Sequence, residues 1–127
     1  MKVISRAQVE HVHTYLINRF GGINGLRDES LLESALATPF QTFDHYPLYP
    51  DPIRRAAKLA HSLISNHPFI DGNKRTGVTI MGIYLKLEGF ELTATNEELI
   101  ELGLKIATHA ELSYVNDWLG SHTARIH

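Results

Sequence analysis

Apolar side chains recur at helical spacing over most of the chain. The first such stretch predicts a helix from about Arg6 to Arg19. Its apolar positions, three or four residues apart, are Val9, Val12, Leu16 and Phe20. Ser5 and Gln8 have the spacing of a capping box in front of this helix, and Gly21-Gly22 is a stop signal behind it.

Four more stretches share this spacing and carry a cap or a breaker at their ends. The second helix is capped by Asp28 or Ser30 and closed by Pro39, and the third runs from the Asp51-Pro52 cap to no later than Asn66. A Thr95–Glu98 capping box opens another helix, and the last helix runs from Ser113 to about Leu119. A polar tail is expected after the last of them.

Some polar side chains on these helices are expected in solvent. Arg54, Arg55 and Lys58 lie opposite the apolar face of the third helix. His11 and His13 are two positions apart, so they point to different sides of the first helix and cannot bind one metal ion together. We expect all five at the surface.

The stretch from Thr76 to Leu87 has apolar residues on every side of a helical wheel, which predicts a helix buried on nearly all sides. Gly77 and Gly82 each cost this helix about 1 kcal/mol relative to alanine, which is tolerable where neighbours press against the backbone. The sequence therefore predicts an all-α fold: one compact domain over residues 1–127, with about six helices around a buried central helix.

Phe40 to Pro50 breaks the helical pattern, because aromatic residues alternate there with prolines. This composition predicts an aromatic loop or a loose hairpin whose rings pack on the body of the protein. Two interpretations stay open: an ordinary crossover loop that fills the core edge, and a loop that carries function.

Composition and charge narrow the class of protein. Of 127 residues, 43% are hydrophobic and 20% are charged, which is typical of a soluble globular domain. A net charge of −2 argues against a dedicated nucleic-acid binder, and the lack of cysteine excludes disulfides and thiolate metal sites. No signal peptide and no apolar run of about 20 residues is present, so we expect a cytoplasmic protein without a membrane segment.

The candidate chemistry lies just before the central stretch, in His67-Pro68-Phe69-Ile70-Asp71-Gly72-Asn73-Lys74-Arg75. Asp71 occupies the expected N-cap position, and a helix start beside Gly72, Lys74 and Arg75 is a site for an anion, above all phosphate. His67 is placed to exchange a proton. Asp71 fits a plain cap as well as a metal ligand, and His61 has no spacing that would let it share a metal with His67.

The nine residues resemble the signature of the Fic/Doc family, H-P-F-x-(D/E)-G-N-(G/K)-R. The N-R-F-G-G around Arg19, the length and the order of helices resemble the Doc branch, the death-on-curing toxins. The resemblance implies a compact helical bundle with the motif on a loop that opens the central helix. It also implies that the loop around Phe40 to Pro50 is a flap that aligns a target polypeptide by strand addition.

The resemblance and the physical roles of the residues agree on an enzyme that uses ATP. His67 would be the general base, and Asp71 would hold Mg²⁺ against nucleotide phosphates. Gly72, Asn73 and the following amides would cradle a phosphate, while Lys74 and Arg75 neutralise charge. A Walker A loop is excluded, because Val78 stands where its lysine would be.

Two departures from the commoner Fic pattern bear on which group is transferred. Lys74 replaces a glycine, and Val78 replaces an arginine that anchors the γ-phosphate for AMP transfer. Doc-type toxins share both departures and phosphorylate a threonine of elongation factor Tu. We therefore predict a protein kinase that inhibits translation. The alternatives are AMP transfer to a protein hydroxyl, a non-catalytic binding module, or a toxin acting on RNA, which the mild acidity disfavours.

The resemblance also implies a partner, a small antitoxin whose flexible tail blocks the cleft. The built-in inhibitory pattern of the family, S/T-x-x-x-E-(G/N), does not occur in this chain. We therefore expect inhibition in trans, a target protein among the translation factors, and no direct contact with nucleic acid.

Overall fold

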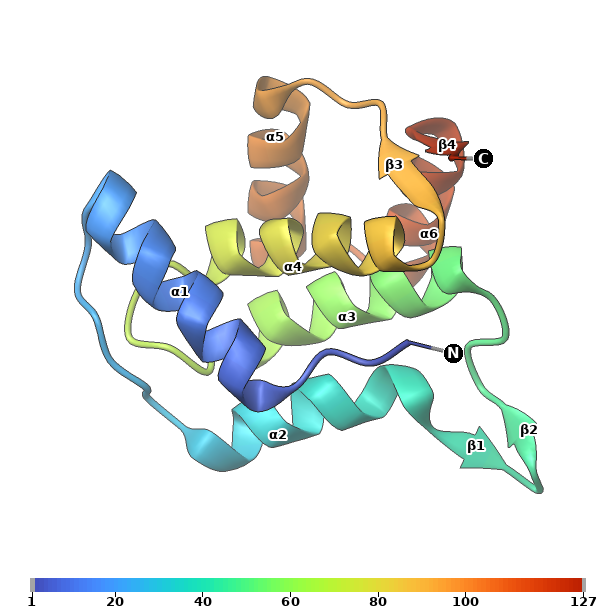
Figure 1. The fold of residues 1–127 in the computed structure, drawn as a ribbon, viewed down its shortest axis with the longest axis horizontal. Helices are drawn as coiled ribbons and strands as arrows, with labels where there is room; N and C mark the ends of the chain where they lie inside the picture. Colours follow the sequence, from blue (N-terminus) through green and yellow to red (C-terminus); the bar gives the residue numbers. More distant parts are fainter. Residues whose placement is uncertain (1, 127) are drawn as a thin grey trace.

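The computed structural model describes residues 2–126, and that part of the chain is mostly helical (Figure 1). Its elements in chain order are α1 (Arg6–Phe20), α2 (Glu29–Ala37), the 3₁₀ turn η1 (Thr38–Phe40), β1 (Thr42–Phe43), β2 (Tyr46–Pro47), α3 (Pro52–Asn66), α4 (Asn73–Leu87), β3 (Phe90–Leu92), α5 (Asn96–Ala107), α6 (Leu112–Ser121) and β4 (Thr123–Arg125). The strands form two small antiparallel pairs, β1–β2 and β3–β4. The predicted class and the six α-helices are confirmed within these residues.

The core forms where α3 and α4 lie side by side, with the other helices packed around them (Figure 1). Ile80, Met81 and Leu85 on α4 are at most 1% exposed. At Gly77 a Cβ atom would lie 2.6 Å from Cγ1 of Ile64, so α3 can approach this closely only because residue 77 is glycine. The expected close contact at Gly77 is confirmed.

Burial of the central helix is less complete than its apolar pattern predicts. Ile83 and Leu87 are 38% and 46% exposed, and they line an open groove between α4 and α1. Apolar residues are common on protein surfaces, so the wheel alone could not distinguish these positions from the buried ones.

The predicted caps are mostly confirmed. Both capping boxes form, at Ser5 before α1 and at Thr95 before α5, and Asp51 caps α3. Asp28, rather than Ser30, caps α2, and the Ser30 hydroxyl donates to the Asp28 carboxylate. Helix α2 ends at Ala37, and the chain continues through Pro39 as the η1 turn.

Arg55 was expected in solvent, and the structure shows it buried, at 7% exposure. Its Nε donates to the Tyr84 hydroxyl at 2.8 Å and its Nη2 to Glu88 at 3.1 Å, while the Tyr84 hydroxyl donates to Glu88 at 2.5 Å. Burial raises the pKa of Tyr84 to about 12. Burial also acts to raise the pKa of Glu88, but the hydrogen bonds from Tyr84 and Arg55 outweigh it and lower that pKa. The contribution of Glu88 to stability is therefore present at neutral pH and is lost as the pH falls through its lowered pKa.

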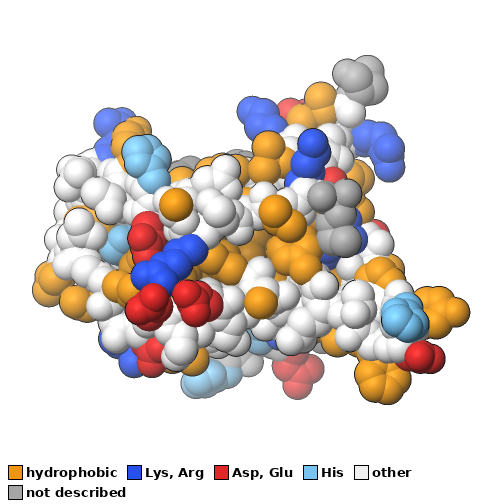
Figure 2. Space-filling model, turned by 60° about the horizontal axis from the view of Figure 1, so that its bottom comes forward, with side chains coloured by type: hydrophobic (Ala, Val, Ile, Leu, Met, Phe, Trp, Pro, Cys, Tyr) orange, Lys and Arg blue, Asp and Glu red, His pale blue; other side chains and the backbone are white. Residues whose placement is uncertain are grey.

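The segment of residues 40–50 contains a hairpin of β1 and β2, which is one of the two shapes that the sequence predicted. Phe43 pairs with Tyr46, and the turn residues Asp44 and His45 both have positive φ, as a type I′ turn requires. The prediction that the aromatic rings pack on the body holds for Phe40, which lies edge-on against Tyr84, but not for Phe43 and Tyr46, which are 75% and 73% exposed. Figure 2 shows hydrophobic side chains standing out at the end of the molecule where Figure 1 places the hairpin.

The expected polar tail is instead part of the fold. Helix α6 continues to Ser121, and β4 then pairs with β3, so that Phe90 lies opposite Arg125. A three-residue strand leaves no periodic signal in the sequence, which is why the pattern missed it. Within residues 2–126 no helix combines the length and hydrophobicity that crossing a bilayer requires.

The buried network gives a test of the fold. Replacing Arg55 by leucine removes the cationic partner of Glu88, whose side chain is 13% exposed, and should lower the free energy of unfolding by about 3 kcal/mol. The matched control is Arg54→Leu, since Arg54 is 57% exposed and lies 3.5 Å from Asp51; its effect should stay within about 0.5 kcal/mol. Urea denaturation measures both, and equal losses would show that the network contributes nothing.

Candidate active site

The motif residues occupy the loop between the two central helices. Helix α3 ends at Asn66, as predicted, and His67 adopts a left-handed conformation with φ 52° and ψ 54°. Gly72 is also left-handed, with φ 79°, and α4 begins at Asn73. The loop thus delivers the predicted anion-binding residues to the N-terminus of α4.

Asp71 does not cap α4, contrary to the prediction. Gly72 is the N-cap residue, and no side chain accepts a hydrogen bond from the first turn of α4. The Asp71 carboxylate instead accepts from two backbone groups: Oδ2 from the N–H of Ile23 at 3.1 Å and Oδ1 from the N–H of Gly72 at 2.8 Å. These two hydrogen bonds lower the pKa of Asp71, so the exposed carboxylate is ionised at neutral pH. The first turn of α4 consequently keeps N–H groups free for a ligand.

The side chain of Asn73 is buried and closes the loop. Its Oδ1 accepts from the Phe69 N–H at 2.9 Å, and its Nδ2 donates to the Phe69 carbonyl at 2.9 Å and to Nδ1 of His67 at 3.1 Å. Asn73 was predicted to bind phosphate; with its side chain engaged in the loop, its backbone N–H is the group left for that role.

The hydrogen bond from Asn73 also determines the tautomer of His67. The two bonds to Phe69 fix the orientation of the Asn73 amide, so Nδ2 is the donor and Nδ1 of His67 must accept. A neutral His67 ring therefore carries its proton on Nε2. Since His67 is exposed, the ring has room to exchange this hydrogen bond for one to a substrate.

The glycine-rich segment before α2 supports the loop from outside. Leu26 forms a β-bridge with Phe69, and the Ile70 N–H donates to the Gly25 carbonyl at 3.0 Å. Phe69 is 2% exposed and enters the core, whereas Ile70 is 47% exposed. This support could not be predicted, because residues 21–28 show no hydrophobic periodicity.

His13 was expected at the surface, and it is 2% exposed. Its ring stacks on Phe69 with centroids 3.8 Å apart, and its Nε2 donates to the Asp71 carbonyl at 2.7 Å. This contact fixes the loop to α1. His61 donates to the Ala110 carbonyl at 3.1 Å, which is a structural role, and burial lowers its pKa.

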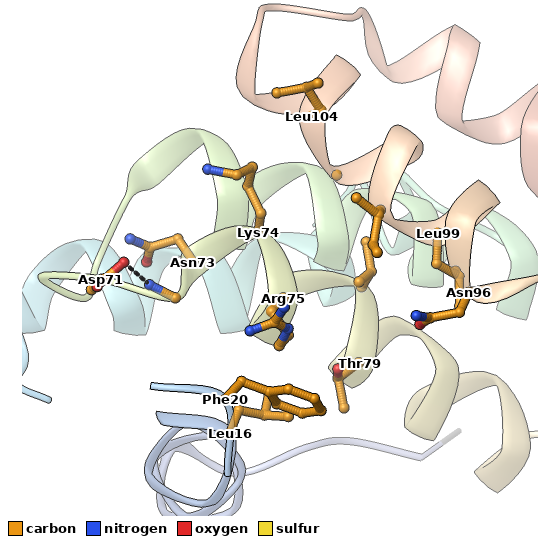
Figure 3. Close-up of a pocket in the computed structure, with 14 residues that line it drawn as sticks. Leu16, Phe20, Asp71, Asn73, Lys74, Arg75, Thr79, Asn96, Leu99 and Leu104 are labelled. Carbon is orange, nitrogen blue, oxygen red and sulfur yellow. Dashed lines mark hydrogen bonds between the residues drawn. The ribbon is translucent and has the colours of Figure 1, made fainter. Parts of the chain in front are cut away.

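The two motif cations lie exposed on the first turn of α4. The Arg75 guanidinium lies 4.2 Å from the centre of the Phe20 ring, so a cation–π contact holds it against the end of α1. Lys74 extends away from Phe20 on the same turn (Figure 3). Among the described residues neither forms an ion pair, so both charges are available to a ligand.

A cavity of about 440 Å³ opens beside this turn. One end is polar and holds the motif residues Asp71 to Arg75; the walls come from α1, α4 and α5 (Figure 3). The wall residues are Leu16, Phe20, Val78, Thr79, Asn96, Leu99, Ile100, Gly103 and Leu104. An apolar cavity with charged groups at one end suits a ligand with an anionic group and a flat apolar part.

Among the described residues that line this cavity, Asp71 is the one with a carboxylate. The described residues contain no group of three histidine or acidic side chains that could enclose a metal ion. Mg²⁺ is commonly held by one or two carboxylates together with substrate phosphates and water. The donor set therefore fits an Mg²⁺ ion that arrives with a nucleotide, with Asp71 as its ligand from the protein.

Comparison with known proteins agrees with this geometry. The chain is 40% identical over 75 residues to the toxin Doc of Mycolicibacterium smegmatis, which covers 59% of this chain and 58% of that protein. It is 32% identical over 88 residues to a Fido domain-containing protein of Dictyostelium discoideum, which covers 65% of this chain and 62% of that protein. The matches thus span less than two thirds of either relative.

A family model described as the Fic/DOC family matches residues 3–85, which is more than half of the chain and includes the whole motif loop. The same stretch holds α1, which supplies His13 and Phe20 to the site, and α4, which supplies Lys74 and Arg75. The chain therefore belongs to the Fic/DOC family.

Proposed function

We propose that the protein is the toxin of a toxin–antitoxin module and acts as a protein kinase. It would transfer the terminal phosphate of ATP to a hydroxyl of a translation factor, elongation factor Tu by resemblance, and so inhibit translation. The observation that carries this proposal is the start of α4, which has no side-chain cap, holds two unpaired cations and lies beside an exposed histidine. The similarity to a toxin named Doc supports the biological role.

The start of α4 would bind the terminal phosphate. Its free N–H groups carry about half a positive charge, and Gly72 allows a phosphate to approach the backbone closely. Lys74 and Arg75 would neutralise the charge that develops on the transferred group. When bound, Mg²⁺ neutralises and orients the phosphates, and Asp71 is the residue that would hold it.

His67 would act as the general base. The target hydroxyl oxygen attacks the γ-phosphorus, the bond from that phosphorus to the bridging oxygen breaks, and ADP leaves with the electron pair. The hydroxyl proton passes to the imidazole of His67. For this the ring must give up the hydrogen bond from Asn73, because that bond occupies Nδ1 while Nε2 carries the proton.

Val78 supports phosphate transfer over AMP transfer. Val78 is 9% exposed, and a Cβ at Gly103 of α5 would lie 3.7 Å from its Cγ1. Helix α5 thus packs closely against Val78. The apolar side chain at position 78 provides no cation for a second phosphate. The cations that line the cavity are Lys74 and Arg75, both on the first turn of α4, and this favours the terminal phosphate at that turn.

Two surfaces would bind protein partners. The exposed edges of the β1–β2 hairpin, with Phe43 and Tyr46, would align the target polypeptide by strand addition. Phe20, Ile100 and Leu104 line the cavity and are each more than half exposed. Apolar groups beside unpaired cations suit an acidic amphipathic segment, so an antitoxin supplied in trans would cover the cavity there.

Transfer from ATP labelled at the γ or the α position, in a bacterial lysate, tests the proposed reaction. Label should reach one protein band from γ-labelled but not from α-labelled ATP. His67→Ala should lower the rate by about 100- to 10,000-fold, because it removes the base. Label from the α position would establish AMP transfer instead. Growth arrest by His67→Ala without any labelled band would favour a non-catalytic binding mechanism.

The role of Asp71 has a separate test. Asp71→Asn should lower the transfer rate about 100-fold at a fixed Mg²⁺ concentration, because the charge that would hold the ion is lost. A titration with Mg²⁺ should show a weaker apparent affinity for the ion. Asp117→Asn, an exposed change on α6, is the matched control. An unchanged Mg²⁺ dependence in Asp71→Asn would show that Asp71 serves only to hold the Ile23 and Gly72 backbone.

A further inference from the structure

The backbone of His67 is held in an unfavourable conformation. With φ 52° and ψ 54° it lies in the left-handed region, where the Cβ of a residue other than glycine crowds the following carbonyl oxygen. Such residues persist where surrounding contacts enforce them, and they concentrate at functional sites. The contacts that enforce this one are therefore of functional interest.

The usual closure of such a helix end is not possible here. After a left-handed residue at the end of a helix, the N–H of the next residue normally donates back to a carbonyl of the last turn. The next residue is Pro68, which has no N–H. The carbonyl groups at the end of α3 must therefore find another donor.

Arg27, outside the motif, donates to the carbonyl groups of the two residues before Pro68. Its Nε donates to the His67 carbonyl at 2.6 Å, and its Nη2 donates to the Asn66 carbonyl at 3.0 Å. One planar guanidinium thus binds the last carbonyl of α3 and the carbonyl of the left-handed residue together. This use of two donors at fixed spacing is specific to arginine.

The backbone around Arg27 is tied to the same loop. The N–H groups of Arg27 and Asp28 both donate to the Pro68 carbonyl, at 2.7 and 3.0 Å, and Leu26 bridges to Phe69. Asp28 also caps α2, which anchors the segment to the body. The Arg27 side chain is thereby aimed at the end of α3 by three consecutive residues.

We infer that Arg27 is a positioning residue for His67. It holds the His67 peptide in the left-handed conformation, from which the imidazole reaches Asn73 beside the first turn of α4. The coupling between Arg27 and His67 stands on the contacts alone, whereas its consequence for the reaction rests on the proposed function. Because Lys74 and Arg75 bind the nucleotide from α4, loss of Arg27 should reduce kcat and leave KM for ATP unchanged.

Three variants separate this role from others. Arg27→Gln removes the charge and the pair of donors, and Arg27→Lys keeps the charge but lacks the planar pair. Arg54→Gln is the matched control, because Arg54 is an exposed arginine at the opposite end of α3. We expect kcat to fall on the order of 10- to 100-fold in both Arg27 variants, as for a misplaced catalytic group, and to stay unchanged in Arg54→Gln.

The ring signals of His67 give a readout that needs no activity. In protein labelled with ¹³C-histidine, the His67 signal is assigned by its loss in His67→Gln. It should shift or broaden in both Arg27 variants, while the signals of the other histidines stay in place. An unchanged His67 signal would overturn the proposal even if the wild type proves to transfer nothing. A raised KM with unchanged kcat would make Arg27 a nucleotide ligand, and full activity in Arg27→Lys would show that only its charge matters.

Stability provides a second route if Arg27→Gln folds poorly. Glycine adopts the left-handed conformation without strain, so His67→Gly removes the backbone strain that Arg27 is inferred to offset. Arg27→Gln should therefore lower the unfolding midpoint less in the His67→Gly background than in the wild type. Equal losses in the two backgrounds would contradict the inference and would reduce Arg27 to a cap of α3 through Asn66.

Discussion

The hydrogen bonds of the Asn73 side chain are the constraint on which the site depends. This one buried amide binds both backbone groups of Phe69 and the ring of His67. It thereby closes the loop onto the start of α4 and leaves Gly72 to make the turn. Carboxamide is the side-chain chemistry that can both accept and donate in this way, since aspartate would face the Phe69 carbonyl with a second acceptor.

Rigid packing around the loop gives the site its precision. Phe69 is buried against His13, and α3 approaches α4 through Gly77, so the loop spans two helices that cannot shift independently. The charged groups, by contrast, stay in solvent on the first turn of α4. A preorganised backbone with free cations suits phosphate chemistry, in which catalysis is largely a matter of position and electrostatics.

Asp71 and His67, the two proton-binding groups of the motif loop, lie in different surroundings. Asp71 is kept ionised by backbone N–H groups, whereas His67 faces solvent and the Asn73 amide. A carboxylate that stays charged can hold a cation while the neighbouring imidazole exchanges a proton. The two residues can therefore serve different roles although they lie within one short loop.

Much of the fold followed from the sequence, because local signals fix helices and their caps. The capping boxes at Ser5 and Thr95 and the stop before Pro68 depend only on neighbouring residues, and each was confirmed. The pattern failed where a partner distant in the chain decides the outcome.

Arg55 is one such case: its environment depends on Tyr84 and Glu88, some thirty positions on. His13 is another, since nothing near it in the chain announces the Phe69 ring. At the site, the motif located the loop, but the choice of Gly72 over Asp71 as the cap depended on the Ile23 N–H, which attracts the Asp71 carboxylate away.

Binding of inorganic phosphate, followed by amide chemical shifts, tests the central claim that the start of α4 is the phosphate site. The account predicts the largest shifts at the N–H groups of Asn73, Lys74 and Arg75, which have no partner within the helix. It also predicts that Lys74→Met weakens binding, while Lys86→Met, at the other end of the same helix, does not. Shifts centred elsewhere, or equal effects of the two lysine changes, would contradict it.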